Sequence, residues 1–278
     1  MKLKHPLPPG RTYEQILNHY EVEKTIAARL MSASREERKK IYAGMYDELF
    51  AKVPDHSRLT RRQDEAETRR ANRGKFALIR RAVNKSTVFA EFAPGDCRFI
   101  MEVAPQVRQA IGIDISDQRN PNDPLPENFR LIVYDGYDLG EIHDESIDLL
   151  FSDQLVEHFH PEDTPLHFQT ANRILKKGGR YIFRTPHLFA GPHDISKYFS
   201  DTPPGFHLKE WTYKELRPVL QQAGFKKISA CMQLKRRLFP LPFFYFTLWE
   251  KILGRFPHTK IRRLAAILIR EIIIIAVK

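Results

Sequence analysis

The most constraining feature of this sequence is the order of residue types between positions 88 and 114. An apolar run containing Glu91 leads into a turn with Gly95, which is followed by about three turns of helix and a second apolar run that contains Asp114. This order predicts a β-α-β unit. In an open parallel sheet, ligands bind outside the carboxyl ends of the strands, where a terminal aspartate can accept hydrogen bonds from ribose hydroxyls. We therefore expect a cofactor that carries a nucleoside.

The turn after the first strand lacks the G-x-G-x-x-G pattern of dinucleotide-binding folds and has Ala93, Gly95 and Cys97 at alternate positions. The pattern acidic-apolar-small-x-Gly-x-small resembles the first motif of class I S-adenosylmethionine-dependent methyltransferases, which has glycine at all three small positions. Because only Gly95 keeps that glycine, close approach of the backbone to the methionine part of the cofactor is assured only there.

The residues that follow extend this resemblance in the order expected for the family. The series is a third strand over 129–134, the pair Asp135-Gly136, a fourth strand over 148–152, a helix start over 154–158, a helix over 168–179, a fifth strand over 180–184 and a turn over 185–187. The order is more specific than any single motif. It implies an α/β fold, a doubly wound and mostly parallel sheet of seven strands.

The resemblance also implies roles for individual residues at the cofactor site. Asp114 would accept the ribose hydroxyls, Asp135 with Gly136 would adjoin the adenine, and Glu91 would face the cofactor's ammonium. The remaining cofactor contacts implied are Ala93, Gly95, Ile115 and Asp153. From the residues alone, Asp114 and Asp135 are equally compatible with turn aspartates, and Glu91 with a strand end that faces solvent.

Residues 1–85 are predicted to form a helical cap in front of the methyltransferase domain, which would span 86–278. Apolar residues recur at helical intervals over 13–31, a capping box at Ser34 and Glu37 predicts a second helix ending near Val53, and a charged third helix is expected over 59–83. In the resemblance, such a cap covers the cofactor or shapes the substrate pocket. It is also compatible with a simple packing appendage.

The segment 188–211 is too long for an ordinary connection and is rich in aromatic residues, so we expect it to be functional. The resemblance implies that this loop, which follows strand five, lines the acceptor pocket. Asp194, Tyr198 and His207 are the predicted substrate-binding residues. The two histidines and Asp194 have no dependable metal-site spacing, so we predict no metal. His158, which follows the fourth strand, is the first choice for a general base, with His187 and His193 after it.

A capping box at Thr212 and Glu215 predicts a further helix ending at Gly224, and a sixth strand follows over 225–234. Ile272 to Val277 is β-branched and, by the resemblance, is the last antiparallel strand between strands five and six. The segment inserted between the sixth strand and this last strand, about 238–268, is predicted to be helical. It is rich in Phe, Trp and Leu and flanked by basic residues, so it could lie in a membrane interface, cover the core or contact a partner subunit.

The formal charge of +11 is unevenly distributed. Residues 1–85 carry 20 Lys+Arg against 11 Asp+Glu, residues 86–200 carry 10 against 18, and residues 201–278 carry 15 against 5. Basic flanks suit an anionic membrane face, a negatively charged substrate or nucleic acid. Interrupted apolar runs and the absence of a signal-like start predict a cytoplasmic protein, with peripheral membrane contact through the C-terminal segment.

These features predict an S-adenosylmethionine-dependent methyltransferase that acts on the oxygen of a sugar or another small polar or lipid-linked acceptor, in a setting such as polysaccharide biosynthesis. RNA methylation is an alternative that the basic flanks favour, although no RNA-binding module or Asn-Pro-Pro-aromatic motif is present. A scaffold that has lost its cofactor is a second alternative, motivated by Ala93 and Cys97. A nicotinamide dehydrogenase fits least, because it needs the glycine fingerprint.

Overall fold

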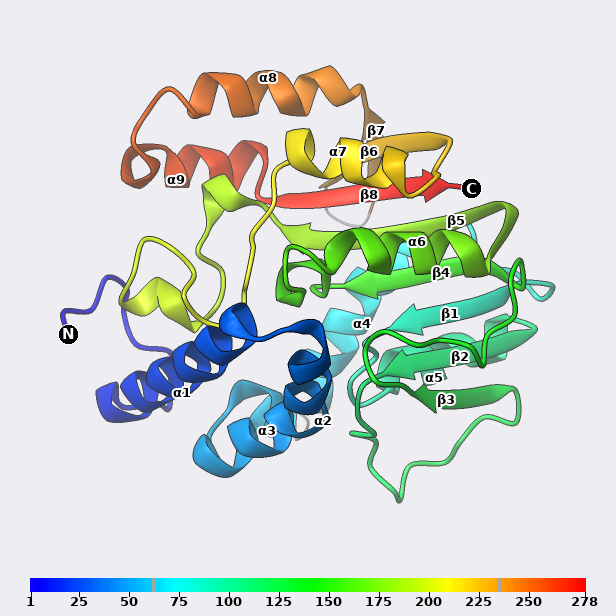
Figure 1. The fold of residues 1–278 in the computed structure, drawn as a ribbon, viewed down its shortest axis with the longest axis horizontal. Helices are drawn as coiled ribbons and strands as arrows, with labels where there is room; N and C mark the ends of the chain where they lie inside the picture. The colour runs from blue at the N-terminus through cyan, green and yellow to red at the C-terminus, as the bar shows by residue number, and fades with distance from the viewer. Residues whose placement is uncertain (62–63, 235–236) are drawn as a thin grey trace.

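The computed structural model describes residues 1–61, 64–234 and 237–278, and it arranges eight strands of this part of the chain in one sheet (Figure 1). The order across the sheet is β3-β2-β1-β4-β5-β8-β6-β7. The strands are β1 (Val88–Phe92), β2 (Gln109–Asp114), β3 (Phe129–Val133), β4 (Ile147–Asp153), β5 (Leu175–Pro186), β6 (Lys227–Leu234), β7 (Arg237–Leu241) and β8 (Glu271–Val277).

The first five strands are parallel, and their carboxyl ends form one edge of the sheet. Phe92 of β1 lies beside Ile113 of β2 and Ser152 of β4, so the residues that follow these strands emerge together. β8 pairs antiparallel with both β5 and β6. The predicted doubly wound α/β fold and the position of the last strand are therefore confirmed.

The sheet has one strand more than the seven predicted, because β7 pairs antiparallel with β6 within the segment expected to be helical. Pro240 lies inside β7 and donates no backbone hydrogen bond. Proline is tolerated at a sheet edge, where one side of the strand has no partner strand. The insertion therefore begins as an edge strand, and its helices start only at Phe243.

Helices cover both faces of the sheet, which explains why β1 is buried along its whole length. Val88, Ala90 and Phe92 pack on the side of α6 and α7, whereas Phe89 packs on the side of α4 and α5. This alternation is the period of a strand buried on two faces. The helices are α1 (Tyr13–Ser32), α2 (Arg35–Lys52), α3 (Ser57–Arg61), α4 (Glu65–Ile79), α5 (Arg98–Val103), α6 (Thr164–Ile174), α7 (Tyr213–Gln222), α8 (Phe243–Leu253) and α9 (His258–Leu268).

The helical cap has the predicted first two helices, and the capping box of Ser34 and Glu37 is formed at the start of α2. The predicted third helix is instead two, α3 and α4, and the part of that prediction at residues 62–63 lies outside the described residues. Asp64 accepts hydrogen bonds from the backbone N–H groups of Ala66 and Glu67, so its side chain starts α4 as a separate helix.

A buried ion pair joins the cap to the sheet domain. Arg38 of α2 donates to Asp163, which precedes α6, with Nε–Oδ2 and Nη2–Oδ1 distances of 2.8 and 3.0 Å. The Tyr137 hydroxyl donates to the same carboxylate at 2.7 Å. Figure 1 shows α1, α2 and α3 in front of the carboxyl ends of the strands, so this contact positions the cap over the edge where ligands bind.

Candidate functional site

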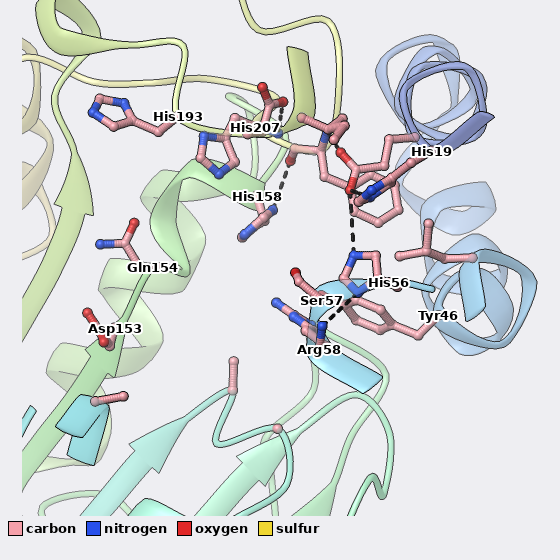
Figure 2. Close-up of a pocket in the computed structure, with 18 of the residues that line it drawn as sticks. His19, Tyr46, His56, Ser57, Arg58, Asp153, Gln154, His158, His193 and His207 are labelled. Atoms are coloured by element: carbon pink, nitrogen blue, oxygen red, sulfur yellow. Dashed lines mark hydrogen bonds and ion pairs between the residues drawn. The ribbon is translucent and has the colours of Figure 1, made fainter. Parts of the chain in front are cut away.

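A cavity of about 1000 Å³ lies between the carboxyl ends of the strands and the cap. Figure 2 shows that Asp153, Gln154 and His158 approach it from the sheet. His19, Tyr46, His56 and Arg58 face it from the cap. The cavity therefore has one wall in each part of the chain, and the cap is required to enclose it.

The turn after β1 has a left-handed backbone at each position where the resembling motif has glycine. Ala93, Gly95 and Cys97 have φ values of 52°, 60° and 60°. Alanine and cysteine adopt this conformation at a cost of about 1–2 kcal/mol each. The loop thus keeps the shape that three glycines would favour, and Ala93 and Gly95, two of the predicted cofactor contacts, line the cavity.

Asp114, the predicted acceptor of the ribose hydroxyls, lies at the end of β2 and lines the cavity. Its Oδ2 accepts the Gly95 N–H at 3.0 Å, and its Oδ1 accepts the Ile115 N–H at 2.8 Å. Burial raises the pKa of Asp114, whereas these backbone donors lower it. Each carboxylate oxygen keeps acceptor capacity toward the cavity, so the side chain fits a pair of ribose hydroxyls.

Glu91 is buried behind the cavity wall, with its Oε1 3.4 Å from the Nζ of Lys75. Among the described residues its Oε2 has no hydrogen-bond partner. Burial raises the pKa of Glu91 to about 7, against the opposing charge of Lys75. A second cation could donate a hydrogen bond to Oε2 of Glu91, and the ammonium of S-adenosylmethionine is such a group.

The adenine side predicted for the cofactor is covered by the cap. Asp135, Gly136 and Ile115 are not among the described residues that line the cavity. Asp135 caps a turn by accepting the N–H of Tyr137 at 2.8 Å, and a Cβ at Gly136 would lie 3.1 Å from the Tyr42 ring. In this conformation Tyr42 of α2 stands beside the position that the resemblance gives to adenine.

Asp153 closes β4 at the cavity and is paired with Arg184 of β5 through Nε–Oδ1 and Nη2–Oδ2 distances of 2.6 and 2.8 Å. A bidentate pair of this kind holds both side chains in one orientation. The following residue, Gln154, has a φ of 58° and also lines the cavity. Sequence reasoning did not single out Gln154, because no motif distinguishes it.

His158 and His207 lie edge to face in the cavity wall with ring centroids 5.1 Å apart. The Nδ1 of His158 donates to the Phe206 carbonyl at 2.9 Å, since that oxygen can only accept. Its Nε2 therefore keeps the lone pair. Burial, with the nearby charge of His207, lowers the pKa of His158 to about 3. His158 is a neutral acceptor throughout the physiological pH range.

His207 is the cationic partner in this pair. Although burial lowers its pKa, a 2.8 Å hydrogen bond to Glu210 and the charges of Glu157 and Asp194 raise the pKa of His207 to about 9. Glu157 is fully buried, and burial raises its pKa to about 7. His207 is therefore an imidazolium that is stabilised by the carboxylates around it.

The other predicted residues of the long loop and turn separate into two places. His193, Asp194 and Tyr198 line the cavity together with His207. His187 is fully buried away from the cavity, where its Nδ1 accepts the Phe189 N–H at 3.1 Å and its Nε2 lies 2.8 Å from Glu250 of α8. The structure therefore brings His158 and His193 into one pocket and leaves His187 in the packing beneath α8.

A second histidine cluster, which the sequence did not indicate, forms the cap side of the cavity. Glu23 Oε1 lies 2.7 Å from His19 Nε2 and 3.9 Å from His56 Nε2. The outer Nδ1 atoms accept hydrogen bonds from Arg11 and from the Arg58 N–H. Both Nε2 atoms must then carry protons toward Glu23. A metal ligand needs the opposite tautomer, so this cluster is a hydrogen-bonded support for the cap.

Comparisons with known proteins agree with this geometry. Residues 90–183 match the family model Methyltransf_11, described as a methyltransferase domain. A chain of the complex between the Haloferax volcanii Trm112 methyltransferase activator and a putative methyltransferase matches with a TM-score of 0.53 and 16% identity, over 88% of this chain and 99% of that chain. No curated protein matches this chain.

Two further solved structures have the same fold. A SAM dependent methyltransferase from Archaeoglobus fulgidus matches with a TM-score of 0.52 and 17% identity, over 76% of this chain and 94% of that one. Phosphoethanolamine N-methyltransferase 1 from Haemonchus contortus matches with a TM-score of 0.51 and 16% identity, over 66% of this chain and 40% of that one.

The chain contains an S-adenosylmethionine-dependent methyltransferase domain with the class I, Rossmann-like fold. Residues 90–183 therefore form a methyltransferase domain, and S-adenosylmethionine is the cofactor of that class of domain. This assignment agrees with the predicted class and with the position of Asp114 beside the turn after β1.

Proposed function

We propose that this enzyme transfers the methyl group of S-adenosylmethionine to an oxygen of a small polar acceptor, such as a sugar or lipid-linked glycan. The observation that carries the proposal is that one cavity is lined both by Asp114 and by His158, His193 and His207. Its cap wall supplies further polar groups, including Arg58. A pocket of this size with mixed polar and apolar walls suits a small ligand that polar groups orient.

The chemistry asked of the protein is mainly positioning. S-adenosylmethionine supplies an electrophilic methyl group with a neutral leaving group. Holding an acceptor in line with such a group can contribute about 7–11 kcal/mol toward the barrier. The ion pair of Asp153 with Arg184 and the imidazolium of His207 give the pocket fixed polar walls. These walls would orient the acceptor.

His158 is the residue we propose to accept the acceptor's proton. Its Nε2 lone pair is free because Nδ1 is held by the Phe206 carbonyl. A base whose pKa lies near 3 removes no proton from a resting hydroxyl, but the oxygen becomes strongly acidic once its bond to the methyl carbon forms. His158 would then act late, with proton transfer following carbon–oxygen bond formation.

The proposal is tested first by titration calorimetry of the full chain with S-adenosylmethionine and, separately, with NADH. We expect binding of the former only. Transfer of tritiated methyl is then measured on sugars, nucleotide sugars, lipid-linked glycans, small phosphorylated amines and RNA. Transfer to a glycan oxygen supports the proposal. Transfer only to RNA or to an amine would overturn the acceptor assignment, and a folded chain that binds no cofactor would be a scaffold.

Replacing His158 with alanine is expected to leave S-adenosylmethionine affinity within about twofold and to lower kcat by about 10²–10⁴-fold. Because His158 stays neutral, the pH profile of the wild-type kcat should show no rise between pH 6 and 7 from this residue. Steady-state kinetics on the acceptor found above provide the measurement. His143, an exposed histidine, gives the matched control variant. Unchanged turnover in the His158 variant would exclude it as the base.

A further inference from the structure

The helical hairpin formed by α8 and α9 exposes large apolar side chains. Figure 1 shows the two helices running in opposite directions at the end of the molecule away from α1 and α3. Phe244 is 68% exposed and Ile267 is 78% exposed. The other exposed apolar side chains between residues 239 and 267 are Phe239, Leu248, Phe256 and Leu264. Such a concentration on one element marks an interaction surface.

Each helix of the hairpin already has a separate apolar face that packs on the core. Phe246 and Leu253 of α8 and Ile261 and Ala265 of α9 are buried in the core cluster. At about 100° per residue, Phe244 and Leu248 project from the opposite side of α8. On α9, Ile267 lies about 120–160° from the buried Ile261 and Ala265, whereas Leu264 borders that buried face. We call the exposed apolar residues of the two helices the outward stripe.

The charges on the outward stripe are all positive. Residues 238–270 contain six basic residues and one acid, Glu250. Glu250 is buried, where it accepts the backbone N–H groups of Tyr213 and Lys214 and contacts His187. The exposed basic residues are Lys251, Arg255, Lys260, Arg263 and Arg270. The solvent side of the hairpin thus combines apolar and cationic side chains with no exposed acid in these residues.

We propose that the outward stripe of α8 and α9 docks on the surface of an anionic lipid bilayer. Apolar side chains flanked by Lys and Arg are the composition of helices that lie in the headgroup region. A second copy of the same surface would bring like charges together, which disfavours self-association through this face. Within the described ranges, no helix has the length and hydropathy needed to span a bilayer.

The hairpin is tied to the loop that lines the acceptor pocket. His258 Nε2 lies 3.1 Å from the Leu188 carbonyl oxygen, and Arg262 Nη2 donates to the Pro192 carbonyl at 3.2 Å. His193 of the cavity wall follows Pro192 directly. Docking through this hairpin would therefore hold the acceptor pocket close to the lipid surface. This consequence rests on the proposed function and favours a lipid-linked acceptor, whereas the docking itself does not depend on catalysis.

The test is flotation of the full chain with vesicles of phosphatidylcholine alone or with 30% phosphatidylglycerol, without cofactor or acceptor. We expect at least tenfold stronger partitioning to the anionic vesicles at low salt, and a steep loss as salt rises. The double variant Phe244→Ser/Leu248→Ser should weaken partitioning at least tenfold. The triple variant Lys251→Glu/Arg255→Glu/Arg263→Glu should do so too and remove the salt dependence.

Matched controls carry the same changes elsewhere on the surface. Met31→Ser/Leu125→Ser alters two exposed apolar residues, and Arg70→Glu/Arg73→Glu/Arg81→Glu reverses three exposed charges on or just after α4. Both should partition within about twofold of wild type. Equal partitioning of all variants, no preference for anionic vesicles, or a dimer in sedimentation that the Phe244 variant dissolves would overturn the proposal. Melting temperatures confirm that each variant is folded.

Discussion

Replacing Asp114 with asparagine is expected to weaken the binding of S-adenosylmethionine by about 10²–10⁴-fold. Two hydrogen bonds from ribose hydroxyls to a carboxylate contribute about 1.5–3 kcal/mol each, which corresponds to this range of affinity. Asparagine loses the charge and exchanges one acceptor oxygen for an N–H₂ donor. It keeps the size of the side chain and one oxygen for the Ile115 N–H. Titration calorimetry provides the measurement.

The matched control for this prediction is Asp117→Asn. Asp117 lies three residues further along the same loop, is 44% exposed at its side chain and pairs with Arg119. Its replacement should change affinity by less than about twofold. Wild-type affinity in the Asp114 variant would contradict the placement of the ribose. Equal loss in both variants would instead point to a general disturbance of the loop.

The features predicted correctly from sequence are those that neighbouring residues determine. The apolar run before Glu91 and the run that closes on Asp114 each specify a buried strand, and parallel pairing then brings their ends to one edge. Thr212 and Glu215 form their capping box within four residues. Because such signals are local, they can be recognised in the sequence without knowledge of the tertiary packing.

The cap side of the cavity was not predicted, because contacts between distant parts of the chain create it. Glu23 of α1 meets His56, which comes 33 positions later in the sequence, and its Oε2 is 3.4 Å from the N–H of Phe206. Arg58, which belongs to the short helix α3, also lines the cavity. A single sequence has no spacing that reveals these pairs.

His187 was predicted to be a catalytic residue, but the structure places it in the packed interior away from the cavity. Its place in the turn after the fifth strand made it a candidate base. The structure pairs it with Glu250, which lies 63 residues away and is the acid that the insertion buries. The same insertion contains β7, which was not predicted. Its proline argues against a strand unless that strand lies at the edge of a sheet.

Replacing Asp163 with alanine is expected to lower the free energy of unfolding by about 3–5 kcal/mol. The change removes the buried carboxylate that pairs with Arg38 and leaves its guanidinium, among the described carboxylates, only the exposed Glu162, whose Oε2 lies 3.5 Å from Nη2. Breaking a buried pair by removing one partner costs about this amount. The Tyr137 hydroxyl loses its acceptor as well. Urea denaturation provides the measurement, and at about 2–4 °C per kcal/mol the melting temperature should fall by about 6–20 °C.

The comparison that isolates burial is Glu65→Ala, which removes the partner of Arg69 in an exposed pair of α4. Exposed pairs contribute about 0–1 kcal/mol, so this variant should melt close to wild type. The double variant Arg38→Met/Asp163→Ala should recover part of the loss, because no unpaired charge remains in the interior. Equal stability of the Asp163 variant and wild type would show that the pair does not hold the cap.

Since the cap encloses the cavity, loss of this contact should also weaken ligand binding in variants that remain folded.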